Sequence, residues 1–237
     1  MWQRAFRLDS ETFTVAMKSI GGAVSIDFER MLDGAENLAE FMDVLAEAQV
    51  DGIYGEIQNA LLSAIAWMPS ANYVSGAYSA TALQALVNTV KAYGGSATIF
   101  ASPEFIDAMG PDAIVPAFSG VAQGIYPVDD IDAIHMTGKI RIFRGAPLIE
   151  IPQSFIDETN TKTWIDDQYA YILPAGKEKV VKVVLEGPTL IHDFTNRDNS
   201  IEVHAYKKMG SAILAYHNWG IYQNTALAGH NENPYGF

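Results

Sequence analysis

Hydrophobic and polar residues alternate near the start of the chain, which predicts an extended segment over residues 4–17. Phe6 and Leu8 are separated by a polar residue, and this period of two is typical of a β-strand. The pair Gly21 and Gly22 is expected to end the segment. A strand so early in the chain needs a partner strand from elsewhere in the chain or from another chain.

The pattern then changes to apolar residues in steps of three and four, which predicts a long helix from residue 27 to about residue 66. Ser25 or Asp27 can cap its start. Such a helix would be about 60 Å long, so it must lie along a sheet edge or a neighbouring subunit. Gly34 and Gly52 weaken the pattern and mark places where the helix could break.

The outer face of this predicted helix is acidic, and Arg30 is the one cation that the pattern places among its carboxylates. A solvated face is the ordinary interpretation. The alternative is a face that contacts a basic surface on a neighbouring molecule. The carboxylates are Asp27, Glu29, Asp33, Glu36, Glu40, Asp43, Glu47, Asp51 and Glu56.

A compact helix–strand–helix unit is predicted next. The first helix covers residues 79–93, with Ser79 as its N-terminal cap, and a short buried strand covers residues 97–101. Pro103 stands at the first position of the second helix, and Gly110 follows its end. Such a unit marks an α/β subdomain.

The second half of the chain is irregular from residue 112 to residue 176 and then rich in β-structure. Glu186, Gly187 and Pro188 predict a turn between two strands. The predicted strands are residues 139–143, 147–151, 169–173, 180–185, 189–194, 201–206 and 212–216.

Composition narrows the classes of function. The 237 residues suffice for one elaborate domain or two small ones, and 49% hydrophobic with 18% charged residues excludes a disordered chain. The formal net charge of -13 disfavours sequence-independent nucleic-acid binding, because phosphates would be repelled. The absence of cysteine excludes disulfides, thiolate metal sites and cysteine nucleophiles.

No segment of the sequence predicts contact with a membrane. No apolar run reaches the roughly 18 residues that span a bilayer, and no apolar core follows the cations near Met1. We therefore expect a soluble protein that is made in the cytoplasm.

The sequence shows no catalytic motif. The 5 histidines lack metal-ligand spacing, and His204 and His217 are expected on β segments. The glycines of residues 120–124 lack the Lys-Ser/Thr of a phosphate loop. The aspartates of residues 129–132 lack the further ligands of a calcium loop, so solvation is the preferred interpretation. We predict no catalytic residue, no cofactor and no bound metal.

Large aromatic and cationic side chains gather in the first thirteen residues. A terminal segment of this kind either packs on its own core or inserts against a neighbour, and its chemistry favours neither. The candidates for contact with a neighbouring subunit are Trp2, Arg4, Phe6, Arg7 and Phe13.

The order of the predicted elements resembles the major capsid protein of tailed bacteriophages. An extended arm, a very long helix, an α/β unit, an irregular region and a return through long β segments follow one another, over about residues 4–225. The specificity lies in this ordered set and not in a single motif. Stretches similar in wording are residues 46–56 (AEAQVDGIYGE), 97–106 (ATIFASPEFI), 124–129 (GIYPVD), 170–176 (AYILPAG), 182–187 (KVVLEG) and 210–214 (GSAIL).

The resemblance implies an α+β fold of the phage major capsid type with three parts. Residues 1–22 would belong to an extended loop that reaches over a neighbouring subunit. Residues 23–69 and 177–215 would form a peripheral domain with a long spine helix and a β-sheet. Residues 70–176 and 216–237 would form an axial α/β domain.

The resemblance also implies a structural function and no enzymatic activity. Identical subunits would assemble as hexamers and pentamers into the icosahedral head, which encloses phage DNA without binding it specifically. Portal, scaffold and cement proteins would be further partners. The protein would be found in the virion after assembly in the host cytoplasm, with no membrane partner.

One feature departs from the family. Its members usually carry an N-terminal arm and an ascending strand before the descending strand of the extended loop, whereas this chain begins within what resembles the descending strand. We therefore expect a fragment, a processed form or a short variant.

Two alternatives remain at this level. An encapsulin shell has the same fold and would show a hydrophobic groove for a cargo peptide, usually lined by an N-terminal helix that this sequence lacks. A soluble α/β enzyme would show a well-formed polar pocket, whereas a capsid subunit should be flat, with its largest exposed apolar patches at neighbour contacts.

Overall fold

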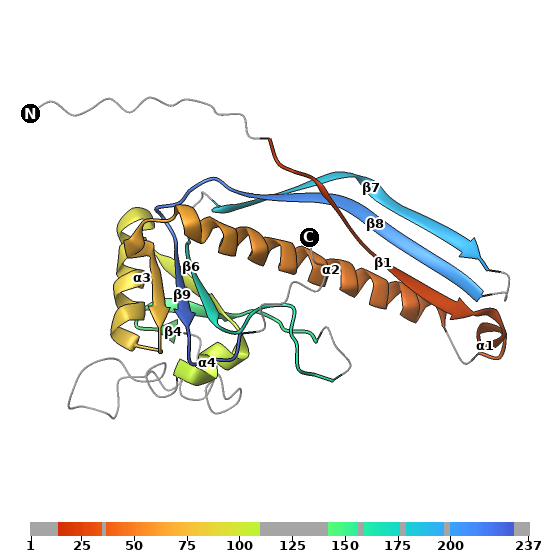
Figure 1. Ribbon diagram of the computed structural model, residues 1–237, viewed down its shortest axis with the longest axis horizontal. Coiled ribbons are helices and arrows are strands. Elements are labelled where there is room, and N and C mark those ends of the chain that lie inside the picture. The colour runs from red at the N-terminus through yellow and green to blue at the C-terminus, as the bar shows by residue number, and fades with distance from the viewer. Residues whose placement is uncertain are drawn as a thin grey trace, which may run out of the picture.

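The computed structural model describes residues 14–34, 37–109, 142–155, 159–175, 179–196 and 200–229. This part of the chain is elongated: a body of a long helix and long strands extends from an α/β unit at one end (Figure 1). The helices are α1 (Phe28–Leu32), α2 (Leu38–Ser63), α3 (Ala80–Gly94) and α4 (Pro103–Met109), with 3-10 turns η1 (Ala64–Trp67) and η2 (Ser70–Asn72). The strands are β1 (Lys18–Asp27), β2 (Tyr73–Gly76), β3 (Ala97–Ala101), β4 (Ile142–Phe143), β5 (Ala146–Glu150), β6 (Tyr169–Pro174), β7 (Val181–Thr195), β8 (Ser200–Ile213) and β9 (Gly220–Asn224).

The body is built on an antiparallel sheet of three strands in the order β1-β8-β7. Successive side chains of a strand point to opposite faces. The face toward α2 carries Val203 and Ala205 of β8, which pack with the buried Leu45 of α2 and with Val24 of β1. We call this the inner face, and the face away from α2 the outer face.

The α/β unit is built on a mixed sheet in the order β2-β9-β6-β3-β5-β4. Helix α3 places its apolar stripe on one face of this sheet, and Leu83, Leu86, Val87 and Val90 are all buried there. Phe105 of α4 belongs to the same core. The buried residues of this core come from the sheet and its two helices and not from the body.

A second core, which we call the junction core, joins the body to the α/β unit. Trp219, which is fully buried, lies at its centre, with Leu61 from the end of α2 and Tyr171 from β6. Val181 of β7 and Ile213 of β8, at the roots of the long strands, pack against it. The junction core therefore fixes the direction in which the body leaves the α/β unit.

The predicted helix–strand–helix unit is confirmed. The Ser79 side chain accepts a hydrogen bond from the Ala82 N–H, and Gly95 ends α3 with a φ of 74°. Strand β3 has the predicted bounds, and α4 begins at Pro103. The Ser102 hydroxyl accepts the Phe105 N–H at 3.2 Å, so this helix also has a cap at its start.

The long helix is shorter than predicted, because its first part is divided. Asp27 ends a strand and caps α1 by accepting the Glu29 N–H at 3.1 Å. The predicted break near Gly34 is confirmed, since Gly34 has a φ of 69°. Helix α2 starts afresh after Asn37, whose side chain accepts the Ala39 N–H. It continues without interruption past Gly52, so of the two glycines proposed for a break only Gly34 marks one.

The expectation that Gly21 and Gly22 end the first strand was also wrong. Strand β1 runs through both glycines and pairs with β8 over its whole length. At Gly21 a side chain would meet the Ala205 carbonyl oxygen and would lie 2.6 Å from Tyr206 Cβ. Glycine is required here because two strands lie in close contact, and not because the chain turns.

Strands β7 and β8 are longer and more continuous than the sequence predicted. The two strands expected at 180–185 and 189–194 are one strand, and the turn expected at Glu186–Pro188 is a bulge within it, with a Gly187 φ of 70°. Strand β8 ends at Ile213, so the strand expected at 212–216 mostly lies outside it. Strands β2 and β9 were not predicted. Of the strand expected at 139–143, residues 139–141 lie outside the described part.

Asn72 links the turn after α2 to the segment before β9. It is buried, and its Nδ2 donates to the His217 carbonyl oxygen at 2.8 Å and to the Trp219 carbonyl oxygen. Replacement by alanine (N72A) would leave two acceptors without these donors, and we expect a loss of about 2–4 kcal/mol in the free energy of unfolding. Urea denaturation of the unassembled protein measures this. The exposed Asn88 provides the control, because N88A should change stability by less than about 0.5 kcal/mol; equal effects would contradict the prediction.

Candidate subunit-contact surfaces

The most unusual surface of the described chain is β7, which is exposed along nearly its whole length. Single exposed apolar residues are ordinary, whereas a continuous set indicates a contact site or an aggregation hazard. The large apolar residues of β7 and their exposed fractions are Val183 41%, Val184 44%, Leu185 51%, Leu190 47%, Ile191 55% and Phe194 54%.

The exposure of β7 follows from its place in the sheet. It is the edge strand beside β8, and within the described residues no strand pairs with its other side. The inner face is covered by α2 chiefly at β1 and β8, where Leu45 meets Val203 and Ala205. Side chains on both faces of β7 therefore remain in contact with water.

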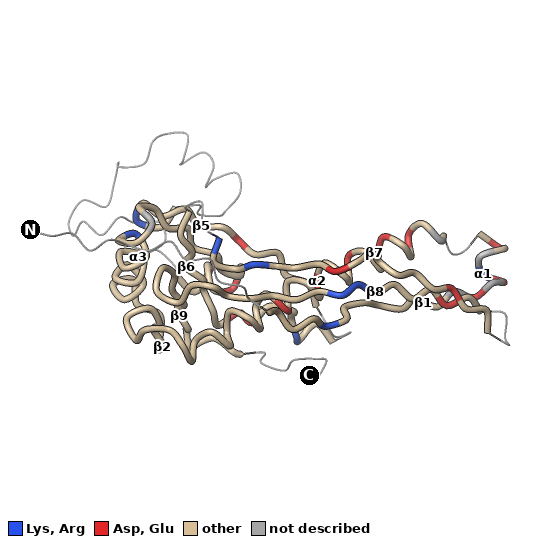
Figure 2. The backbone as a smooth tube through the Cα atoms, turned by 90° about the horizontal axis from the view of Figure 1, so that it is seen from above, with Lys and Arg blue, Asp and Glu red and all other residues tan. Residues whose placement is uncertain are grey.

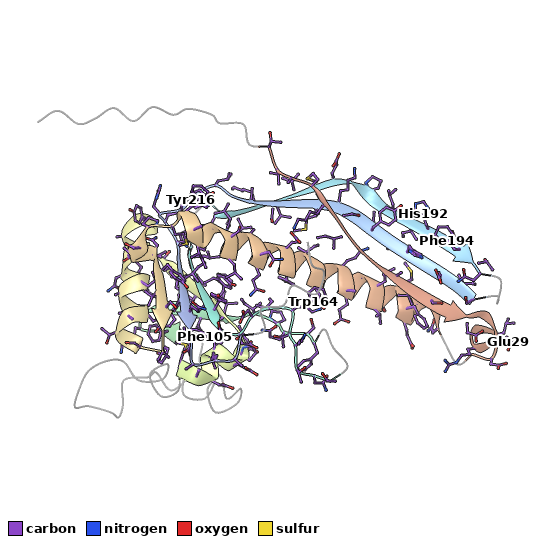
Figure 3. The ribbon with its side chains drawn as sticks, in the orientation of Figure 1. Glu29, Phe105, Trp164, His192, Phe194 and Tyr216 are labelled. Carbon is purple, nitrogen blue, oxygen red and sulfur yellow. The ribbon has the colours of Figure 1, made fainter. Side chains whose placement is uncertain are left out.

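The outer face carries a cluster of ring side chains near the far end of the body. His192 of β7 is stacked on Tyr206 of β8, with ring centroids 5.6 Å apart, and Phe194 meets His204 edge-on at 5.4 Å. Figure 3 labels His192 and Phe194 on this part of β7. On β1 the matching positions, opposite Tyr206 and His204, are small residues. The rings are thus not covered by β1 and offer an aromatic surface to a partner.

The polar groups beside this cluster form a small network. Glu202 Oε2 lies 3.3 Å from His204 Nε2, and both side chains are 39% exposed. Asn196 Nδ2 donates to Glu202 Oε1 at 2.8 Å. Among the described residues no group of three or more His, Asp or Glu side chains is placed to hold a metal ion. The network positions side chains at the hairpin end and supplies no metal centre.

His217 does not lie on a β segment as predicted, because it falls in the bend between β8 and β9. His204 does lie on β8, directly opposite His192. The glycines of residues 120–124 and the aspartates of residues 129–132 lie outside the described residues. The interpretation of the glycines as a loop and of the aspartates as solvated side chains stays a prediction.

A partly buried polar network holds the segment after β5 against α2. Ser154 Oγ donates to Asp51 Oδ2 at 2.7 Å, and Gln153 Nε2 donates to Asp167 Oδ1 at 2.8 Å. Figure 3 shows Trp164, from the same segment, beside α2. Burial raises the pKa of the Tyr171 hydroxyl well above its usual range, and a hydrogen bond with Gln58 offsets only part of this increase. Tyr171 therefore stays protonated and acts as a structural group.

The acidic face predicted for the long helix is partly confirmed. Its carboxylates are exposed at the described positions from Asp27 to Glu47, whereas Asp51 accepts from Ser154 and Glu56 pairs with Lys18 at 3.3 Å. Glu36 lies outside the described residues. Figure 2 shows carboxylates toward the α1 end of the body and cations on β8 nearer its middle. Contact of this face with a basic neighbour stays a prediction.

The contact residues expected near the N-terminus stay a prediction. Trp2, Arg4, Phe6, Arg7 and Phe13 all lie outside the described residues. The apolar surface of β7 was missed as a candidate, although its signal was present in the sequence. An apolar run with one cation and one anion at residues 181–186 was interpreted only as a strand.

The chain from residue 4 to residue 218 matches a family described as "SPbeta prophage-derived putative capsid protein YonB". The chain belongs to this family. The family match covers the body and most of the α/β unit, and it ends just before Trp219 and β9. No protein in a comparison with curated sequences matches the chain.

Solved structures show that the fold is that of phage capsid proteins and encapsulins, as predicted. The capsid of an empty GTA particle matches with a TM-score of 0.59 and 12% identity over 94% of this chain and 79% of that chain. Mycobacterium phage Che8 matches with a TM-score of 0.56 and 15% identity over 89% and 71%. The holo-SrpI encapsulin complex from Synechococcus elongatus matches with a TM-score of 0.55 and 17% identity over 91% and 75%. The α+β class is confirmed as well.

Proposed function

We propose that this chain is the major capsid protein of a phage-type shell, in which identical copies form hexamers and pentamers and tile a closed icosahedral particle. The observation that carries the proposal is the capsid-family match over residues 4–218. The extended body supports it, because a continuous exposed apolar strand is suited to contacts between copies. The family and the fold point to a structural role and not to an enzymatic one.

The proposed domains of the capsid protein correspond to the parts of the fold. Residues 23–69 and 177–215 would be the peripheral domain, and they contain α2, β7, β8 and half of β1. Residues 70–176 and 216–237 would be the axial domain, and they contain the strands of the six-stranded sheet. Residues 1–22 would belong to the extended loop that reaches over a neighbour.

The charge of the chain suits a shell that encloses DNA without holding it. A net charge of -13 repels phosphates, so packaged DNA would be confined by the closed shell and not by specific contacts. Portal, scaffold and cement proteins would be additional partners during assembly in the host cytoplasm, and the mature location would be the virion. In the described residues no helix is long and apolar enough to cross a membrane.

Electron microscopy of native material tests the proposal directly. We expect closed particles of megadalton mass with nucleic acid inside. Native material that contained only monomers or dimers would contradict a shell function. Closed particles that contained a cargo protein in place of nucleic acid would support the encapsulin alternative, which shares the fold.

The aromatic residues of the first thirteen positions provide a second test. We expect W2S/F6S/F13S to abolish particle formation while the unfolding temperature of the unassembled chain stays the same, because these side chains would bind a neighbour and not their own core. S10A/T12A changes polar positions of the same segment and should assemble normally. Light scattering and thermal unfolding measure the two effects. A lower unfolding temperature of the triple variant would show that the segment packs on its own chain.

A further inference from the structure

The first half of β7 is an unpaired strand edge with an unusual sequence. Residues 182–186 read Lys-Val-Val-Leu-Glu, and all five are exposed. Strand β8 pairs with one side of β7, and within the described residues no strand pairs with the other side. Exposed N–H and C=O groups on such an edge are a template for another strand.

This short sequence is complementary to itself when it runs antiparallel. If Val184 lies opposite Val184 of a second copy, Lys182 lies opposite Glu186 of that copy, and Val183 lies opposite Leu185. The two-fold relation repeats each of these pairs. Opposite charges and apolar pairs directly across two strands are both stabilising. Each position of the edge thus meets a favourable partner.

These cross-strand pairs lie on both faces of the sheet. Lys182, Val184 and Glu186 lie on the outer face, opposite Ala212, Gly210 and Lys208 of β8. Val183 and Leu185 lie on the inner face and are 41% and 51% exposed. Pairing with a second copy would therefore remove apolar side chains from water on both faces at once.

The charged residues are available for such a contact. Within the described part of the chain, neither Lys182 nor Glu186 makes an ion pair, although Lys208 stands directly across from Glu186 on β8. The ends of the edge are exposed and charged, and its centre is apolar. This is the usual distribution of a contact between proteins, with an apolar centre and a polar rim.

The residues that follow limit the pairing to this segment. Gly187 has a φ of 70°, and the register of β7 against β8 shifts between Glu186 and Leu190. Pro188 lies within the shift and has no N–H to donate. A bulge bends and twists its strand, so a partner strand cannot follow β7 beyond it. The contact is short and has one register.

We propose that two copies of this chain pair antiparallel through residues 182–186 of β7, about a two-fold axis at Val184. The two three-stranded sheets then form one continuous sheet of six strands. A contact of this symmetry uses the same surface on both copies. This inference rests on the proposed shell function, which supplies the neighbouring copies. It adds the residues and the symmetry of one contact between them.

A single engineered cysteine tests the position of the axis. The chain has no cysteine, so the thiols of V184C can react only with each other. Residues directly opposite in an antiparallel pair have Cα atoms about 4.5–5.5 Å apart, which suits a disulfide. Under mild oxidation we expect full-length V184C to form a covalent dimer on a non-reducing gel, in assembled and in unassembled protein.

Two controls have nearly the same exposure. Val183, replaced in V183C, is 41% exposed but would lie opposite Leu185 of the second copy. Leu190, replaced in L190C, is 47% exposed but follows the bulge. Both should remain mostly monomeric. If V184C forms no more dimer than these two controls, the proposed contact is wrong.

Charge reversal tests the pairing itself. K182E and E186K each place like charges opposite each other twice, and we expect each to weaken dimerisation of the full-length protein by about tenfold or more. A mixture of the two variants restores opposite charges at both places and should dimerise like the original protein. A folding defect within one chain would not be restored by mixing. Failure of the mixture to dimerise, in protein with an unchanged unfolding temperature, would refute the pairing.

These experiments distinguish a failure of the proposed β7 contact from a failure of the proposed shell function. Closed particles in which V184C stays monomeric would contradict the β7 contact and leave the shell function intact. Specific V184C dimers in material that never forms particles would support the contact and contradict the shell function.

Discussion

Replacing Trp219 by alanine (W219A) is expected to reduce the free energy of unfolding by about 3–5 kcal/mol. Trp219 is fully buried at the centre of the junction core, where it packs with residues from α2 and from the six-stranded sheet. Its indole N–H also donates to the Ala215 carbonyl oxygen at 2.6 Å. A domain is stable by only about 5–15 kcal/mol, so the loss would remove a large share of this stability.

The position of Trp219 gives this substitution a second effect. The junction core holds the end of α2 and the roots of β7 and β8, so a cavity there would loosen the angle between the body and the α/β unit. We therefore expect W219A to form few or irregular particles even under conditions where the chain remains folded. Denaturant unfolding measures the first effect, and electron microscopy measures the second.

Trp67 provides a matched control within the same chain. It lies in η1, directly after α2, and 76% of it is exposed. W67A should change the free energy of unfolding by less than about 0.5 kcal/mol. If the two tryptophan variants were equally destabilised, the buried position of Trp219 would be incorrect.

Local signals in the sequence were sufficient for the helix–strand–helix part of the α/β unit, α3, β3 and α4. Ser79 and Ser102 cap α3 and α4 with their side chains, and Gly95 adopts a positive φ at the end of α3. Each of these interactions joins residues that are close in sequence, so residue types can indicate such a helix end without knowledge of the whole fold. The family resemblance added the fold class, which the comparisons with known proteins confirmed.

Pairing between distant strands could not be predicted in the same way. Gly21 and Gly22 have the composition of a turn, and only the presence of β8 beside them makes them part of a strand. Gly187 and Pro188 likewise suggest a turn, but β8 continues past them and converts the feature into a bulge. In both places the pairing partner decides the structure, and it lies more than fifteen residues away in the sequence.

The candidate contact surface was only partly visible in the sequence for a related reason. An apolar strand is predicted equally well whether it lies in the centre of a sheet or at its edge. The exposure of Val184 and Leu185 follows from the order β1-β8-β7 and from the place of α2 below β1 and β8. Similarly, Asp51 leaves the acidic face because Ser154 binds it from a distant segment.

Replacing Gly21 by valine (G21V) should be as damaging as W219A, although Gly21 is exposed. Its neighbour across the strand pair is Tyr206 of β8, and a Cβ at Gly21 would lie 2.6 Å from Tyr206 Cβ and 2.8 Å from Tyr206 Cα. These are main-chain or main-chain-proximal atoms that cannot rotate away. We expect a loss of about 3 kcal/mol, at the upper end of the range for overpacking.

The same strand offers the control for G21V. Ala23 lies on the outer face of β1 two residues later, is exposed, and stands opposite His204. Since valine is favoured in strands, A23V should be neutral or slightly stabilising, and it should assemble normally. G21V should form no particles, because separation of β1 from β8 displaces the chain that leads to the N-terminal segment. Thermal unfolding and light scattering of the two variants, side by side, would detect this difference; a G21V protein as stable as A23V would mean that β1 and β8 are not in close contact at Gly21.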